Sequence, residues 1–142
     1  MSHPAGLPDL FIDRSLGRIQ VPALLRAAEL RLVTLAEHYG IPADQKVRDA
    51  TWLQLVGERG WVALMKDRHV RFNRAEQEAV KRYAVRCFCI PRQNLTAQAM
   101  ANRFLHNLGA MEAACRGLAP SCMRSMSAGF VRSRSSDAGT RP

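Results

Sequence analysis

Short apolar runs alternate with amphipathic segments along this chain, and the alternation limits its fold more than any other feature. Four apolar runs have the length of buried strands, at residues 10–12, 30–35, 61–65 and 85–90. Apolar side chains at three- and four-residue spacing predict helices between and after these runs, at residues 19–29, 49–60, 73–83 and 96–115. Strands joined by helical crossovers form a mostly parallel sheet covered on both faces, so we predict an α/β fold.

The end of the chain carries a weaker pattern. Residues 120–126 and 130–131 predict a terminal strand or a hairpin, and a polar, basic stretch follows from residue 133. A chain of 142 residues has the size of one ordinary domain. We therefore expect one domain over residues 1–132 and a disordered basic tail over residues 133–142.

Composition excludes several classes of protein. Apolar residues make up 47% of the chain and charged residues 23%, which argues against general disorder. No apolar run approaches the roughly 18–20 residues of a membrane span, and residues 1–8 lack the basic and apolar regions of a secretory signal. Four cysteines without a C-x-x-C pair argue against a disulfide scaffold or a zinc site. These features predict a cytoplasmic protein that does not bind membranes.

The net charge points to a polyanionic partner. It is +9 at neutral pH, and the isoelectric point is about 10.4. The charge is uneven, because residues 1–70 carry nine basic and eight acidic side chains, whereas residues 71–142 carry twelve and four. Most of the acids thus lie in the half of the chain where the charges nearly cancel.

Several of these acids fall where a parallel sheet would bring them together. Asp13 and Asp67 each follow a predicted strand, Asp49 begins the helix before the third strand, and Glu37 and Asp44 lie in the predicted loop after the second. Strand carboxyl ends and the helix starts that follow them share one edge of such a sheet. Clustered carboxylates repel one another unless a divalent cation lies among them. The pattern therefore predicts a site for Mg²⁺ or Mn²⁺.

Each acid also has an ordinary structural explanation. Asp49 alone is more often a helix cap, and Glu37 and Asp44 alone are usually solvated loop acids. Aspartate after a strand, such as Asp13, is common in turns. The shared edge, rather than any single residue, favours the metal site.

Basic residues accompany this predicted edge. They include Arg14, Lys66 and Arg68, and further arginines at positions 18, 71 and 74. A divalent cation flanked by guanidinium and ammonium groups can hold a phosphodiester, so we interpret Arg14, Lys66 and Arg68 as phosphate-binding residues. For any one of these arginines, a solvated surface position is the alternative.

Ordered motifs along the chain resemble the PIN-like domain family. They are residues 10–17 (LFIDRSLG), 32–40 (LVTLAEHYG), Asp49 with Trp52-Leu53, 57–62 (GERGWV) and Lys66-Asp67. Within this family the chain is most similar to the VapC-type toxins of bacterial toxin–antitoxin pairs. The similarity extends to about Val131 and covers nearly the whole chain.

This resemblance implies a fold, an activity and partners. The fold would be an α/β/α sandwich around a mostly parallel sheet, and the activity a Mg²⁺- or Mn²⁺-dependent endoribonuclease. Such toxins are neutralised by a cognate antitoxin of the VapB type, which binds a hydrophobic groove beside the site, and they usually form homodimers. The catalytic and metal-binding acids of the family fall on Asp13, Asp49 and Asp67, and Glu37 lies where relatives often have another.

Two departures from the family pattern leave an alternative open. Relatives commonly have further carboxylates directly after the position of Asp49, where this chain has Ala50 and Thr51. Many also have a fourth acid shortly after the position of Asp67, where this chain has basic residues at 68, 69 and 71. The alternative is a catalytically weak or inactive PIN-like module that binds RNA or protein. A phosphoacceptor domain of the response-regulator type is disfavoured, because Arg14 rather than a second acid follows Asp13.

Overall fold

A six-stranded sheet forms the centre of the computed structural model, which describes residues 3–17, 19–66, 74–90, 95–116, 121–126 and 129–132, the last two stretches as backbone only. Its strands are β1 (Leu10–Ile12), β2 (Leu32–Thr34), β3 (Val62–Lys66), β4 (Arg86–Ile90), β5 (Ser121–Met126) and β6 (Gly129–Arg132). Their order is β2-β1-β3-β4-β5-β6, and all neighbours are parallel except the β5–β6 hairpin. The predicted mostly parallel sheet and the terminal hairpin are both confirmed.

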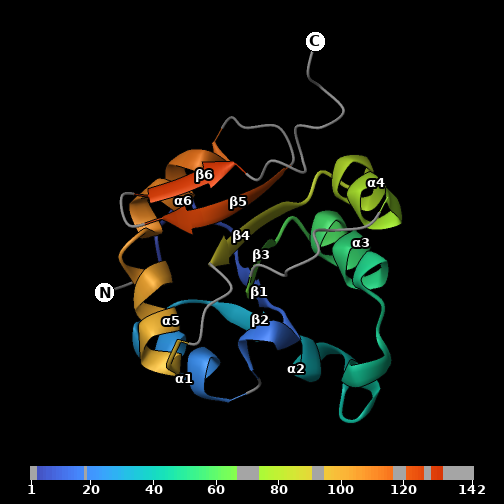
Figure 1. Cartoon of the computed structure of the whole chain (residues 1–142), viewed down its shortest axis with the longest axis horizontal. Helices are drawn as coiled ribbons and strands as arrows, with labels where there is room; N and C mark the ends of the chain where they lie inside the picture. Colours follow the sequence, from blue (N-terminus) through green and yellow to red (C-terminus); the bar gives the residue numbers. More distant parts are fainter. Residues whose placement is uncertain are drawn as a thin grey trace.

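Helices connect the strands. They are the 3₁₀ helices η1 (Arg14–Leu16) and η2 (Ala43–Lys46), and the α-helices α1 (Gln20–Ala27), α2 (Leu35–Tyr39), α3 (Asp49–Arg59), α4 (Arg74–Arg82), α5 (Ala97–Leu105) and α6 (Leu108–Cys115). Figure 1 shows α1 and α5 on one side of the sheet and α3 and α4 on the other. No helix in the described ranges is long and apolar enough to cross a membrane.

Side chains that alternate along the strands supply two cores. Leu10 and Ile12 of β1 pack with residues of α1, α5 and α6, while Phe11 between them packs with Trp52 and Val56 of α3. Strand β3 divides in the same way, with Leu64 in the first core and Met65 in the second. A sheet buried on both faces is the expected form of parallel strands, and it makes the molecule a three-layer α/β/α structure.

Two helices differ from the sequence prediction. The predicted loop after the second strand contains the short helix α2, which a capping box between Thr34 and Glu37 stabilises. The single helix predicted over residues 96–115 is interrupted between α5 and α6. There the side chain of Asn107 donates to the carbonyl of Arg103 at 2.6 Å, a bond that competes with the helical ladder.

Helix α3 ends within one residue of its predicted end, and its two glycines have different roles. Gly60, with a φ of 70°, is its left-handed C-cap, whereas Gly57 lies inside the helix. A Cβ atom at Gly57 would overlap the carbonyl of Tyr83, which follows α4. Glycine at this position therefore allows α3 and α4 to pack closely on the second face of the sheet.

Candidate active site

Asp13 lies at the carboxyl end of β1 and is fully buried. It is the N-cap of η1, and its Oδ2 accepts a hydrogen bond from the Ser15 backbone N–H at 3.2 Å. Its own N–H donates to the carbonyl of Leu64 in β3 at 3.0 Å. The backbone of Asp13 is therefore bonded to β3, while its carboxylate is bonded to the first turn of η1.

Ser15 links this turn to the end of β3. Its Oγ accepts a hydrogen bond from the backbone N–H of Lys66 at 2.9 Å. This bond places Lys66, one of the predicted phosphate-binding residues, beside the turn that carries Asp13. Asp67 and Arg68, predicted as a metal ligand and a phosphate-binding residue, lie outside the described residues.

Asp49 is the first residue of α3 rather than its predicted N-cap. The cap position belongs to Arg48, whose side chain makes no capping bond. The Asp49 carboxylate, with 8% of the residue exposed, instead accepts a hydrogen bond from Nε1 of Trp52 at 2.9 Å. The Asp49 side chain therefore accepts a hydrogen bond from a buried indole and is not the N-cap of α3.

Arg14 connects η1 to the segment that precedes α3. Its Nη2 donates to the carbonyl of Asp44 at 2.8 Å and to the carbonyl of Val47 at 2.7 Å. These bonds hold the chain two residues before Asp49 against the turn that begins at Asp13. Arg14 therefore holds the turn with Asp13 and the segment before Asp49 together at one edge of the molecule. The sequence analysis interpreted Arg14 as a phosphate-binding residue and did not predict this structural role.

An open groove of about 480 Å³ runs along this edge. It is lined by Arg14, Val47, Arg48, Asp49, Ala50, Ala75 and Glu76. Glu76, in the first turn of α4, is an acid of the groove that the sequence analysis did not single out. Its position in the first turn of the helix after β3 is the signal that could have found it, because such turns lie at the carboxyl edge of the sheet.

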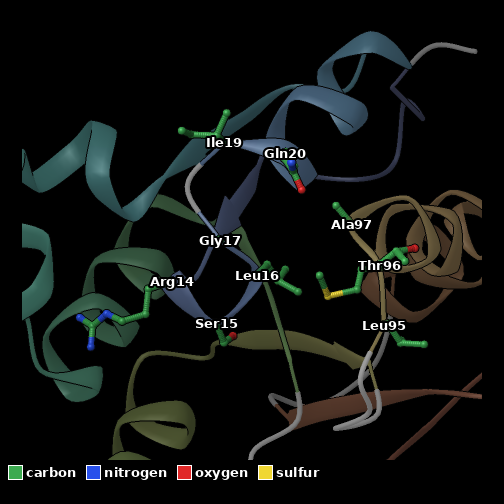
Figure 2. Close-up of a pocket in the computed structure, with 10 residues that line it drawn as sticks. Arg14, Ser15, Leu16, Gly17, Ile19, Gln20, Leu95, Thr96 and Ala97 are labelled. Atoms are coloured by element: carbon green, nitrogen blue, oxygen red, sulfur yellow. The ribbon is translucent and has the colours of Figure 1, made fainter.

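A second, larger hollow of about 910 Å³ lies on the other side of Arg14. Its lining comes from the connection between β1 and α1 and from the start of α5, namely Arg14, Ser15, Leu16, Gly17, Ile19, Gln20, Leu95, Thr96, Ala97 and Met100. Figure 2 shows the Arg14 side chain directed away from Leu95 and Thr96. The hollow is mostly apolar, and Ile19 at its rim is 76% exposed.

Glu37 has partners that differ from its predicted metal role. Its carboxylate pairs with the Arg26 guanidinium through contacts of 2.6 and 2.8 Å, and it also accepts from the N–H of Thr34. Hydrogen bonds from Arg26 lower the pKa of Glu37, and burial offsets them only in part. Because Arg26 and the backbone of Thr34 already hold this carboxylate at the start of α2, we leave Glu37 out of the proposed ligand set.

The arrangement meets part of what a magnesium site needs. Asp13 and Asp49 offer buried carboxylate oxygens, the donors that Mg²⁺ and Mn²⁺ prefer, and Asp44 in η2 is buried as well. Within the part of the chain that the structure describes, no group of three or more possible ligands is close enough to hold a metal ion. The predicted third ligand, Asp67, falls outside that part.

Comparison with known proteins identifies the fold family. A family model described as "PIN like domain" matches residues 8–92, more than half of the chain. The chain belongs to the PIN-like domain family. It is also 42% identical over 112 residues to a protein of Mycobacterium tuberculosis (strain ATCC 25618 / H37Rv) named "Putative ribonuclease VapC45", a match that covers 79% of this chain and 81% of that protein. No solved structure matches the chain significantly.

The family match confirms two of the sequence predictions. The resemblance to a VapC-type PIN-like domain is borne out by the family model and by the relative. The α/β/α architecture around a mostly parallel sheet agrees with that family. The matched segment of the PIN-like domain contains Asp13, Asp49 and Asp67.

Proposed function

We propose that this PIN-like protein is a divalent-metal-dependent endoribonuclease of the VapC type. The observation that carries the proposal is the pair of buried carboxylates, Asp13 and Asp49, that β1 and α3 present at one edge of the sheet. Carboxylate oxygens are the ligands that Mg²⁺ and Mn²⁺ prefer. The ribonuclease name of the mycobacterial relative supports RNA as the substrate.

Different residues of this chain would have different roles in phosphodiester hydrolysis. Asp13, Asp49 and Asp67 would hold Mg²⁺ or Mn²⁺. When bound, the cation lowers the pKa of a coordinated water and offsets charge at the phosphate. Lys66 and Arg68 orient the phosphate groups by charge. Arg14 keeps the segment before Asp49 in place, and its positive charge adds to the potential at the groove.

The partners of the proposed toxin follow from the VapC resemblance. We expect a cytoplasmic homodimer that a VapB-type antitoxin neutralises. The apolar hollow beside Arg14, with Ile19, Leu95 and Met100 in its lining, has the character of the antitoxin groove that the resemblance implies. Co-expression with a candidate antitoxin encoded by a neighbouring gene, followed by co-purification, tests this partner.

Expression of active and inactive forms tests the nuclease directly. We expect new RNA ends in cells that express the wild-type chain, and none in cells that express Asp13→Asn or Asp67→Asn. Asparagine at position 13 retains an acceptor for the Ser15 N–H, so the fold should survive. Sequencing of RNA ends provides the measurement. Cleavage that persists in either purified, folded variant would overturn the proposal.

One observation favours a second function, a PIN-like module that binds RNA or protein without cutting. Among the described residues, no three possible metal ligands are placed to hold an ion, and Ala50 and Thr51 stand where the family resemblance leads us to expect acids. Calorimetric titration with Mg²⁺ or Mn²⁺ distinguishes the two functions. Binding of metal at or below millimolar concentration supports the nuclease, whereas RNA binding without metal binding supports the module.

A further inference from the structure

The hydrogen bond between Trp52 and Asp49 joins the candidate site to the hydrophobic core. The two residues are three positions apart in α3 and therefore share one face of the helix. Nε1 of Trp52 donates to Oδ1 of Asp49 at 2.9 Å, with both partners buried. Trp52 is completely inaccessible to solvent, so its ring cannot stack on a base of RNA.

Strand β1 fixes the indole ring in turn. The ring stacks on Phe11 with centroids 5.6 Å apart and planes 25° apart. Trp61 also stacks on Phe11, at 5.9 Å and 14°. Phe11 precedes Asp13 by two residues in the same chain segment. The orientation of the Asp49 carboxylate is thereby coupled, through Trp52 and Phe11, to the strand that carries Asp13.

We propose that Trp52 is a positioning residue, which orients the Asp49 carboxylate for a divalent cation shared with Asp13. This inference rests on the proposed metal-dependent function. Carboxylates that bind metals are themselves hydrogen-bonded, and loss of such a bond commonly weakens metal affinity by 10–100-fold. An indole N–H suits this purpose because it donates without adding a charge that would compete with the cation.

The competing explanation is that Asp49 merely satisfies the N–H of a buried tryptophan. A buried indole does need an acceptor, but a backbone carbonyl or a neutral amide would serve at a lower desolvation cost than a carboxylate. Asp49 also lines the open groove. The need of the indole N–H for an acceptor does not explain why that acceptor is a carboxylate. The two explanations differ in what they predict for metal affinity.

Binding of Mn²⁺ to the whole protein, measured by calorimetry without RNA, tests the inference. We expect Trp52→Phe to weaken Mn²⁺ affinity by about tenfold, because phenylalanine keeps the ring but lacks the donor. The matched control is Trp61→Phe, which changes the other ring on Phe11 and should bind Mn²⁺ as the wild type does. The midpoint of thermal unfolding of each variant shows whether its fold is intact.

Tryptophan fluorescence provides a second measurement that does not depend on the folding of Trp52→Phe. The chain contains two tryptophans, so Trp61→Phe leaves Trp52 as the sole indole. We expect Mg²⁺ to change the emission of that indole, and Asp49→Asn in the same background to abolish the change. Mg²⁺ is the probe because it does not itself quench fluorescence through unpaired electrons.

The outcomes separate this inference from the proposed function. Tenfold weaker Mn²⁺ binding in Trp52→Phe, together with the Mg²⁺-dependent emission change, supports the positioning role. Wild-type metal affinity in a folded Trp52→Phe variant, or Mg²⁺ binding that leaves the Trp52 emission unchanged, overturns it while the nuclease proposal stands. A wild-type protein that binds neither cation overturns both.

Discussion

The connections that follow β1 and β2 begin alike and end differently. Each strand leads directly into a short helix with an N-cap residue at its start. Asp13, the residue after β1, is the N-cap of η1, and Thr34, the last residue of β2, is the N-cap of α2. Both connections contain an acid that the sequence analysis predicts as a metal ligand. After β1 the acid is the cap itself and is fully buried, whereas after β2 the acid is Glu37, exposed in the first turn of the helix.

The partners of the two acids explain the difference. The Asp13 carboxylate is fully buried and accepts a hydrogen bond from the N–H of Ser15. Glu37 is held by the Arg26 guanidinium and by the capping box of Thr34. Glu37 therefore has a structural role at the start of α2, whereas Asp13 is buried at the end of β1 and is bonded through its backbone to β3.

The largest expected effect comes from exchanging each acid for its amide. Asp13→Asn should abolish metal-dependent RNA cleavage, whereas Glu37→Gln should cleave at close to the wild-type rate, because Glu37 supports α2 rather than the groove. Cleavage of a labelled RNA in the presence of Mn²⁺ measures both. A folded Glu37→Gln variant without activity would show that the second connection also belongs to the site.

The bond from Lys66 to Ser15 offers a smaller effect on the first connection. Ser15→Ala leaves the Lys66 N–H without this acceptor, which should lower the free energy of unfolding by about 1–2 kcal/mol. Ser15→Thr retains the hydroxyl and serves as the matched control. Urea unfolding of the two variants provides the measurement. Equal stability of the alanine and threonine variants would show that the hydroxyl does not tie β1 to β3.

A substitution at Arg14 can distinguish two roles of this side chain, which are support of the backbone and contact with phosphate. Arg14→Lys keeps the charge but cannot bridge the carbonyls of Asp44 and Val47 with one planar group. We expect it to lower the free energy of unfolding by about 0.5–1 kcal/mol, because both bonds are partly exposed, and to leave the salt dependence of RNA binding unchanged. Unchanged stability with altered RNA binding would favour the phosphate contact instead.

The sequence pattern was sufficient to predict the sheet and most of its helices. Apolar runs of three to six residues between amphipathic segments have few foldable arrangements, and those at residues 61–65 and 85–90 match β3 and β4 closely. The break between α5 and α6 was missed because the apolar spacing continues across it. It depends on a side chain, that of Asn107, bonding to the backbone, which periodicity does not detect.

Prediction of the candidate site was less complete, because partners matter as much as positions. The edge that carries Asp13 and Asp49 follows from topology alone. The bond of Asp49 to Trp52 and the bridge from Arg14 to Val47 depend on side-chain geometry that one sequence does not specify. The pairing of Glu37 with Thr34 was open to prediction, since residues 34–37 match the capping-box pattern T-x-x-E.

The smallest expected effect is the pH dependence of the second connection. Hydrogen bonds from Arg26 hold the pKa of Glu37 below its ordinary value of 4.5, so the stability that this pair contributes is present above that pH and is lost as the pH falls through the lowered pKa. Glu37→Gln keeps the capping box but removes the charge. Its melting temperature should therefore lie below that of the wild type near about pH 7 and approach it near about pH 3. A constant difference across this range would mean that the charge of Glu37 does not stabilise the fold, and it would remove the contrast with Asp13.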